Sequence, residues 1–262
     1  MVMTVTQYSN VIQAVQSGGK ISRLKVIFSL RSNLMVFVIF TLGSCSVAQE
    51  HSPSEITSNE LVERTRQAYA RCSSYTDSGD VMISIFGGLA ELEITGNFHT
   101  HLLRPNLFRI EYREKLPFAR KESYYTVLKK NGEITSLWDV TGSKKSESSL
   151  SMALVGATGV THGSAYTIPR LLFPTELAGR ELFDINIDND VNLVTFETAE
   201  CYLLTGKSKT ASYEITIDRK SFLIRKIVME RRSGGKKTKQ ITTYRPEIEV
   251  DLNESIFVLK QE

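Results

Sequence analysis

Regular alternation of apolar and polar residues constrains the fold of this 262-residue chain more than any other feature of its sequence. The alternation runs through residues 92–101, 107–113 and 211–218. Successive side chains of a β-strand point to opposite faces of its sheet, so each stretch predicts a strand with one dry face and one wet face. The predicted dry-face residues are Leu92, Ile94, Phe98, Phe108, Ile110, Tyr112, Tyr213, Ile215 and Ile217.

Further strands are predicted along most of the remaining chain. The candidate segments are 81–86, 123–128, 134–140, 191–198, 202–205, 222–231 and 240–244. Turn-forming groups such as Asn131-Gly132 and Ser233-Gly234-Gly235 separate them. Roughly ten strands joined by short turns predict one large, curved antiparallel sheet with a meander-like order. The fold class is therefore mainly β with a few helices, an α+β fold.

Helices are predicted before the sheet and in the middle of it. Thr57 and Glu60 form a capping box, and apolar residues then recur every three or four positions as far as Cys72. Residues 147–174 interrupt the strand pattern with apolar residues at helical spacing. Helices inserted there must cover the dry face of the sheet, which either packs shut or keeps a cavity for an apolar ligand.

Three glycines divide this insert, and they are candidate hinges. Gly156, Gly159 and Gly163 can adopt backbone angles that other residues avoid. A lid over a cavity must release its ligand, so we expect it to be held by a few polar contacts. The insert 147–174 is therefore predicted to be a hinged lid.

The first 48 residues have the layout of a bacterial export leader. The uncharged run Leu34–Leu42 follows four basic residues and precedes small residues. It is short for a spanning helix, which needs roughly 20 apolar residues, so cleavage is favoured over a permanent anchor. Two cleavage sites stay open. Ser46-Val47-Ala48 suits an ordinary signal peptidase, whereas Leu42-Gly43-Ser44-Cys45 resembles a lipobox that would make Cys45 a lipidated N-terminus.

These sites predict a leader over 1–48, a linker over 49–58 and a folded domain over 59–262, with Cys45 or Gln49 as the mature N-terminus. The mature protein would lie in the periplasm or cell envelope, either soluble or anchored to a membrane through Cys45. The leader holds four basic residues and no acid, so its removal changes the formal net charge from +3 to −1. No basic stripe remains that would suit a nucleic-acid partner.

Two cysteines, Cys72 and Cys201, lie beyond the leader. A pair in an oxidising compartment can form a disulfide. Two buried, unpaired thiols are the alternative, which the sequence favours.

Three short motifs resemble reactive or ligand-binding sites but lack essential parts. His99 and His101 share a strand face without a third convergent zinc ligand, and a wet strand face explains them. Residues 159–164 contain a His and a Ser but no nucleophile elbow. Residues 234–238 lack the first Gly and the following helix of a phosphate loop. We predict no catalytic residue, metal site or cofactor, and an enzyme, metal-dependent or hydrolytic, is the least favoured function.

Three segments resemble the LolA family of periplasmic carriers of outer-membrane lipoproteins. They are LRPNLFRIEY at 103–112, NGEITSLWD at 131–139 and ITIDRKSFLI at 215–224, and the resemblance spans most of 61–258. It implies an unclosed β-barrel with a helical lid and an apolar cavity for acyl chains, walled by the dry-face residues. Lipid acyl chains or lipoproteins would then be the partners of a carrier or an anchored acceptor.

The resemblance also implies a role for Arg104. The Arg at this position of the carriers bonds the lid helices closed, and a guanidinium can donate several hydrogen bonds in a fixed fork. A surface arginine that begins a strand is the alternative. A second function is also open, because some LolA-like domains of envelope-stress regulators bind a protein. The chain would then be a non-catalytic sensor or interaction module with a protein partner in the envelope.

Overall fold

The computed structural model describes residues 52–53, 56–87, 91–115, 122–161, 164–177, 179 and 181–259. The chain divides into two units, Met1–Ala48 and Gln49–Glu262, and every described element belongs to the second unit. The leader with Cys45, both cleavage sites, His162 and Gly163 lie outside the described residues.

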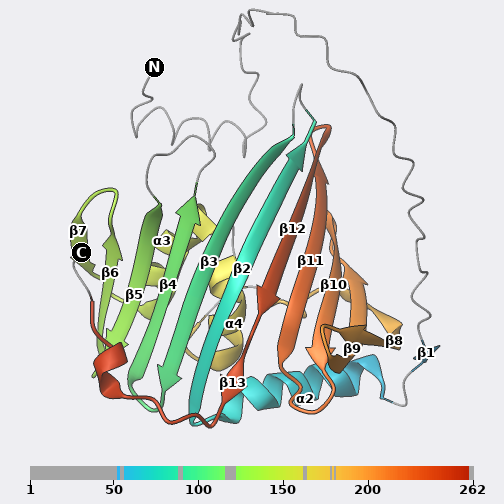
Figure 1. Ribbon diagram of the computed structural model, residues 1–262, viewed down its shortest axis with the longest axis horizontal. Coiled ribbons are helices and arrows are strands. Elements are labelled where there is room, and N and C mark those ends of the chain that lie inside the picture. Colours follow the sequence, from blue (N-terminus) through green and yellow to red (C-terminus); the bar gives the residue numbers. More distant parts are fainter. Residues whose placement is uncertain are drawn as a thin grey trace, which may run out of the picture. The chain divides into compact units, whose positions relative to one another are not determined.

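One antiparallel sheet dominates the described part of the chain (Figure 1). Its first series of neighbouring strands is β2 (Ser74–Phe86), β3 (Leu92–Leu103), β4 (Leu107–Lys115), β5 (Ser123–Lys130), β6 (Glu133–Trp138) and β7 (Ser143–Ser146). Its second series is β8 (Asn186–Phe196), β9 (Ala199–Lys207), β10 (Ala211–Asp218), β11 (Ile224–Ser233) and β12 (Lys236–Tyr244). The sheet is curved and does not close, which confirms the predicted fold class.

The strand order differs from the simple meander that the short turns predicted. Each series is a meander, but the two are joined where the last long strand, β12, pairs with the first, β2. The short strand β1 (Ser52–Pro53) pairs with β8, and β13 (Glu247–Ile248) pairs with β2. Turn chemistry specifies neighbours along the chain and leaves the pairing of distant strands open.

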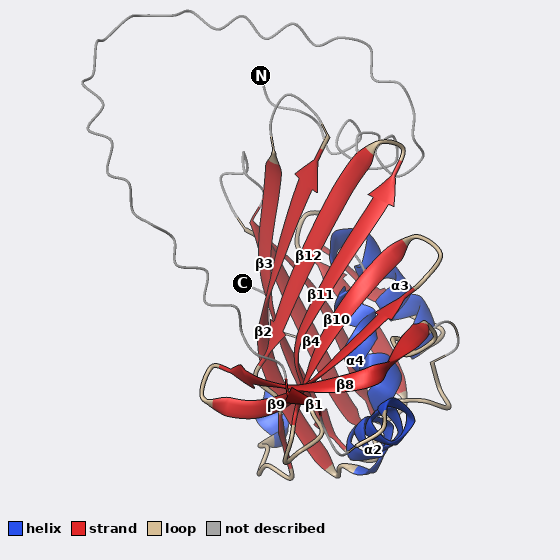
Figure 2. Cartoon of the chain, turned by 90° about the vertical axis from the view of Figure 1, so that its right-hand side faces the viewer, coloured by secondary structure: helices blue, strands red, loops and turns tan. Residues whose placement is uncertain are grey.

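Helices lie on the concave side of the sheet (Figure 2). α2 (Ser58–Arg71) begins as predicted, because Thr57 Oγ1 accepts a hydrogen bond from the Glu60 N–H at 3.2 Å. The insert forms α3 (Leu150–Thr161) and α4 (Ser164–Leu172). The helix of α3 continues through Gly156 and Gly159, where the sequence predicted a looser chain.

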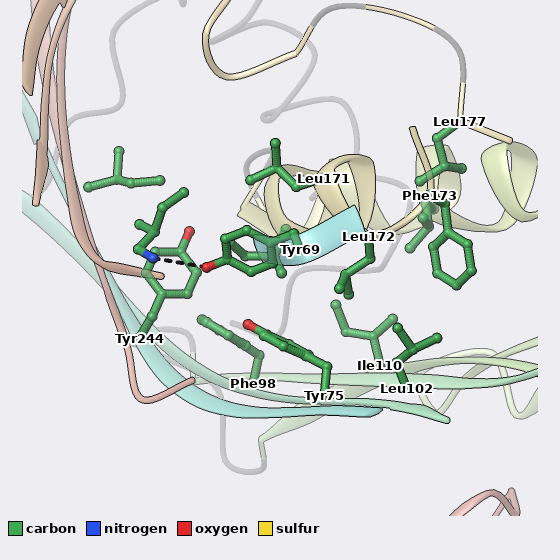
Figure 3. Packing of buried hydrophobic residues seen from close by; sticks show 14 of the residues in the cluster. Tyr69, Tyr75, Phe98, Leu102, Ile110, Leu171, Leu172, Phe173, Leu177 and Tyr244 are labelled. Carbon is green, nitrogen blue, oxygen red and sulfur yellow. Dashed lines mark hydrogen bonds between the residues drawn. The ribbon is translucent and has the colours of Figure 1, made fainter. Parts of the chain in front are cut away.

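The core lies between these helices and the concave face (Figure 3). Tyr69 of α2 is fully buried, and its hydroxyl accepts a hydrogen bond at 3.0 Å from the Ile224 N–H at the start of β11. Tyr75 of β2 packs against the Tyr69 ring, with their centroids 5.7 Å apart. Tyr69 therefore joins α2 to both series of strands, to β2 through the Tyr75 ring and to β11 through the Ile224 N–H.

Two glycines in the sheet lie beneath aromatic rings. A Cβ atom on Gly79 would be 2.2 Å from the Phe98 ring, and one on Gly96 would be 2.5 Å from the Tyr112 hydroxyl. Each glycine therefore lets a ring on a neighbouring strand lie flat against the concave face. No other residue type could occupy these positions without moving the ring.

The C-terminal segment crosses the ends of the first strands. Glu249 accepts hydrogen bonds from the N–H (2.9 Å) and hydroxyl of Ser73, and the Ser74 hydroxyl bonds the Val250 carbonyl at 2.7 Å. The segment then forms the short helix η1 (Glu254–Ile256), and Phe257 beyond it is fully buried. Among the described residues no helix has both the length and the apolar character needed to cross a bilayer.

Candidate functional site

A cavity of about 330 Å³ lies between α4 and the second series of strands. We refer to it as the α4 cavity. Its helix side is formed by Tyr166, Thr167 and Arg170. Its sheet side is formed by Tyr213, Ile227, Met229, Gln240, Thr242 and Tyr244, and Glu181, Leu182, Ile185 and Ser208 complete it. The volume lies at the lower end of the roughly 300–1,000 Å³ that small-molecule sites occupy.

The sheet side of this cavity continues into one lateral row of residues across the concave face. Strand register places Val191, Leu204, Ile215, Ile227, Thr242, Val81, Gly96 and Glu114 side by side, each on the next strand of the sheet. The row is apolar at its β8 end and becomes polar at Thr242 and again at Glu114. Every residue of the row except Gly96 is buried.

The nine predicted dry-face residues are distributed unevenly around this site. Tyr213 lines the α4 cavity and is half-buried. Leu92, the first residue of β3, is 40% exposed. The other seven are buried on the concave face: Ile94, Phe98, Phe108, Ile110, Tyr112, Ile215 and Ile217.

Most residues that line the α4 cavity were not predicted from the sequence. Met229, Gln240 and Thr242 belong to segments for which we predicted strands without assigning their faces. In β11 the apolar run Ile227-Val228-Met229 shows no alternation, so the sequence does not indicate which of these residues face the cavity. The helix side, including Arg170, could not be assigned from the sequence either, because α4 and the strands that it faces are far apart in the chain.

Arg104 lies where three elements meet, directly before Pro105 at the β3–β4 turn. Its Nε donates to the Cys72 carbonyl at 2.8 Å, and its Nη2 donates to the Leu172 carbonyl at 2.7 Å and to the Tyr69 carbonyl at 3.4 Å. These carbonyls lie at the C-terminal ends of α2 and α4. We call this set of contacts the Arg104 junction. The guanidinium thus contacts the helix-terminal carbonyls that its predicted role requires.

Other contacts fasten the insert to the sheet. The Tyr125 hydroxyl donates to the Ala153 carbonyl of α3 at 3.1 Å, and Lys129 Nζ pairs with Glu176 at 2.5 Å. The ring of Phe173 packs edge-on against Phe108, with the ring centroids 5.2 Å apart. These polar contacts add to the apolar packing of α3 and α4 on the concave face.

The convex face carries a second hollow, of about 470 Å³, lined by Asp80, Met82, Asn97, Arg113 and Lys115 among others. It is larger than the α4 cavity, and like that cavity, whose wall includes Arg170 and Glu181, it has charged side chains in its lining. Among the described elements, no helix contributes to its wall. It is therefore the poorer site for an apolar ligand.

The histidine motif also lies on the convex face. His101 Nδ1 is 3.0 Å from the Thr76 hydroxyl, and burial lowers the pKa of this histidine to about 4, with nearby Arg109 acting in the same direction. Glu111 pairs with Arg109 and, at 2.8 Å, with Arg113. Within the described ranges, no three His, Cys, Asp or Glu side chains converge as a metal site would require.

Cys72 and Cys201 are free, buried thiols. The Cys72 Sγ lies 3.2 Å from the Tyr69 carbonyl at the end of α2, and Cys201 lies within β9. Burial raises the pKa of both thiols, to about 11 for Cys201, which makes them poor nucleophiles. The structure therefore has the unpaired alternative and not the disulfide.

No family model and no curated protein matches the chain. Solved structures similar to it include a LolA superfamily protein from Nitrosomonas europaea, with 13% identity, a TM-score of 0.32 and coverage of 78% of this chain and 98% of that one. A DUF1329 family protein from Desulfovibrio piger has 11% identity, a TM-score of 0.35 and coverage of 76% and 94%. The MucA/MucB complex of Pseudomonas aeruginosa has 11% identity, a TM-score of 0.37 and coverage of 76% and 60%. The LolA superfamily is also the one that the sequence resembles.

Proposed function

We propose that this protein binds an acyl chain of a lipid or lipoprotein in the α4 cavity, as an exported carrier or anchored acceptor of the cell envelope. The observation that carries the proposal is the cavity between an apolar curved sheet and a helix that covers it. An apolar ligand gains roughly 25 cal/mol for each Å² of apolar surface removed from water. The residues that would contact the chain are Tyr213, Ile227 and Met229 on the sheet and Tyr166 on α4.

Release of such a ligand requires α4 to move. The Leu172 carbonyl accepts one guanidinium hydrogen bond from Arg104, at the end of the helix, and this bond can break and reform during transfer. Ile168, Leu171 and Leu172 of α4 are buried in the core, so the movement would also have to separate this apolar packing. Gly156 and Gly159 in α3 remain candidate hinges for the same movement.

The α4 cavity can be tested by filling it. Met229→Trp places a large side chain in the cavity, and Met82→Trp makes the same exchange on the convex face, where Met82 is 36% exposed. Both proteins are delipidated, exposed to a cell-envelope extract, and examined by native mass spectrometry. We expect acylated species on the wild type and on Met82→Trp, and none on Met229→Trp.

Two results would contradict the proposal. Equal lipid occupancy in Met229→Trp and Met82→Trp would exclude the α4 cavity as the binding site. A wild-type protein that stays free of lipid but captures a polypeptide would instead favour the sensor or interaction module. Bound metal would revive an enzymatic function.

A further inference from the structure

Glu114 is a carboxylic acid on the apolar face of the sheet. It follows Ile110 and Tyr112 on β4 at the period of two, so its side chain is on the concave face with theirs. It is only 6% exposed, and no hydrogen bond or ion pair to it exists within the part of the chain that the structure describes. Its neighbours along the strand, Arg113 and Lys115, project to the opposite face.

The hydroxyl of Tyr112 is a second buried polar group beside it. This residue is 2% exposed, and its hydroxyl has no hydrogen-bond partner among the described residues. The hydroxyl reaches over Gly96, which lies directly across the ladder from Glu114. Burial raises the pKa of Tyr112, and the charge of Glu114 raises it further.

A buried polar group without a partner loses roughly 1–3 kcal/mol relative to the same group in water, a cost that the fully buried Tyr112 hydroxyl carries. Burial raises the pKa of Glu114 to about 7. A ligand that brings a positively charged hydrogen-bond donor would relieve both costs.

We propose that Glu114 and Tyr112 form a polar subsite for the protonated amine of an amphiphile whose apolar tail lies in the α4 cavity. The inference rests on the function proposed above and adds the chemical class of the ligand's polar group. An ammonium has three donors, which can serve the carboxylate and the phenol together. An anionic head group at the same place would meet a like charge.

The distance between the two parts of the site suits a long-chain amine. Glu114 is three strands from Thr242 of the α4 cavity in the lateral row, which is roughly 14 Å at about 4.8 Å per strand. Val81 and Gly96 lie between them in the row; Val81 is 1% exposed, and the Tyr112 side chain covers Gly96. A chain with its amine at Glu114 would have to displace these side chains to extend toward the cavity along the concave face.

The test compares three probes with the same tail on the delipidated protein at pH 7.5: dodecylamine, dodecanol and dodecanoate, each below its critical micelle concentration. Isothermal titration calorimetry gives the affinities. We expect the amine to bind about tenfold or more tightly than the alcohol, the value for one charge-assisted hydrogen bond, and dodecanoate to bind weakest. Glu114→Gln should abolish the preference for the amine and leave the affinity for dodecanol unchanged.

The matched control is Glu93→Gln, which removes an exposed acid from the neighbouring strand β3 and should retain the preference for the amine. Tyr112→Phe, which keeps the ring, should reduce the amine affinity severalfold. Equal binding of amine and alcohol by the wild type would overturn the inference and leave the proposed function intact, as would a preference that persists in Glu114→Gln. Failure of all three probes to bind would overturn both. The wild-type comparison decides even if a variant does not fold.

Discussion

Arg104→Leu should loosen α4 without unfolding the protein. Leucine keeps part of the aliphatic stem and removes every donor of the Arg104 junction. The bond that reaches α4 is the one from Nη2 to the Leu172 carbonyl, 2.7 Å long and partly buried. A hydrogen bond to a charged group contributes about 1.5–3 kcal/mol, which corresponds to a roughly 10- to 150-fold increase in the population of the open helix.

Hydrogen exchange measured by mass spectrometry reports this change directly. Amides of α4, Ser164–Leu172, should exchange faster by that factor, whereas those in the middle of β3 should not change. Arg104→Lys keeps a charged donor group without the planar fork and should give an intermediate rate. Arg219→Leu removes an arginine from an exposed ion pair with Glu200 and should have no effect. Unchanged exchange in α4, with the fold intact, would refute a role for Arg104 in holding the lid.

Three further predictions concern stability, measured by chemical denaturation. Tyr69→Phe should lower the free energy of unfolding by about 1–3 kcal/mol, because the buried Ile224 N–H loses its acceptor; an unchanged value would mean that another acceptor replaces it. Gly79→Ala should cost about 1–3 kcal/mol, because its Cβ would overlap both the Phe98 ring and the Thr243 carbonyl oxygen, and no loss would show that the ring and the β12 backbone can both move. Glu114 has a folded pKa of about 7, above its unfolded value, so the folded state binds the proton more tightly. The stability that Glu114 contributes should therefore be lost as the pH rises from 4.5 to about 7, and Glu114→Gln should remove this component, whereas His101, with its lowered pKa, acts in the opposite direction.

Alternation in the sequence was sufficient to assign the faces of several strands. In β4 the residues Phe108, Ile110 and Tyr112 are all buried, as their period of two predicted. The capping box likewise fixed the start of α2. These features depend on neighbouring residues only, so the sequence carries them without knowledge of the fold.

The site was harder to predict, for specific physical reasons. The alternation was followed only to Arg113, so Glu114, two positions beyond Tyr112 on the same face, was not recognised as buried. Leu92 fits the dry-face pattern but is 40% exposed. The period of two tells which face of the sheet a side chain is on, but it does not tell whether other residues cover that part of the face. The cavity itself depends on how α4 rests on strands far away in the sequence, and no local pattern encodes that contact.

The pairing of β12 with β2 has a consequence for how the chain folds. Phe86 faces Lys237 across this ladder, and the pairing is what joins the two series of strands into one sheet. Closing so long a loop costs entropy that no local contact repays, so this joint should form late. Until β12 has formed, the strands of the first series keep the edge of β2 open. Such an edge invites pairing with other chains, so misassembly is most to be expected in the interval before β12 covers it.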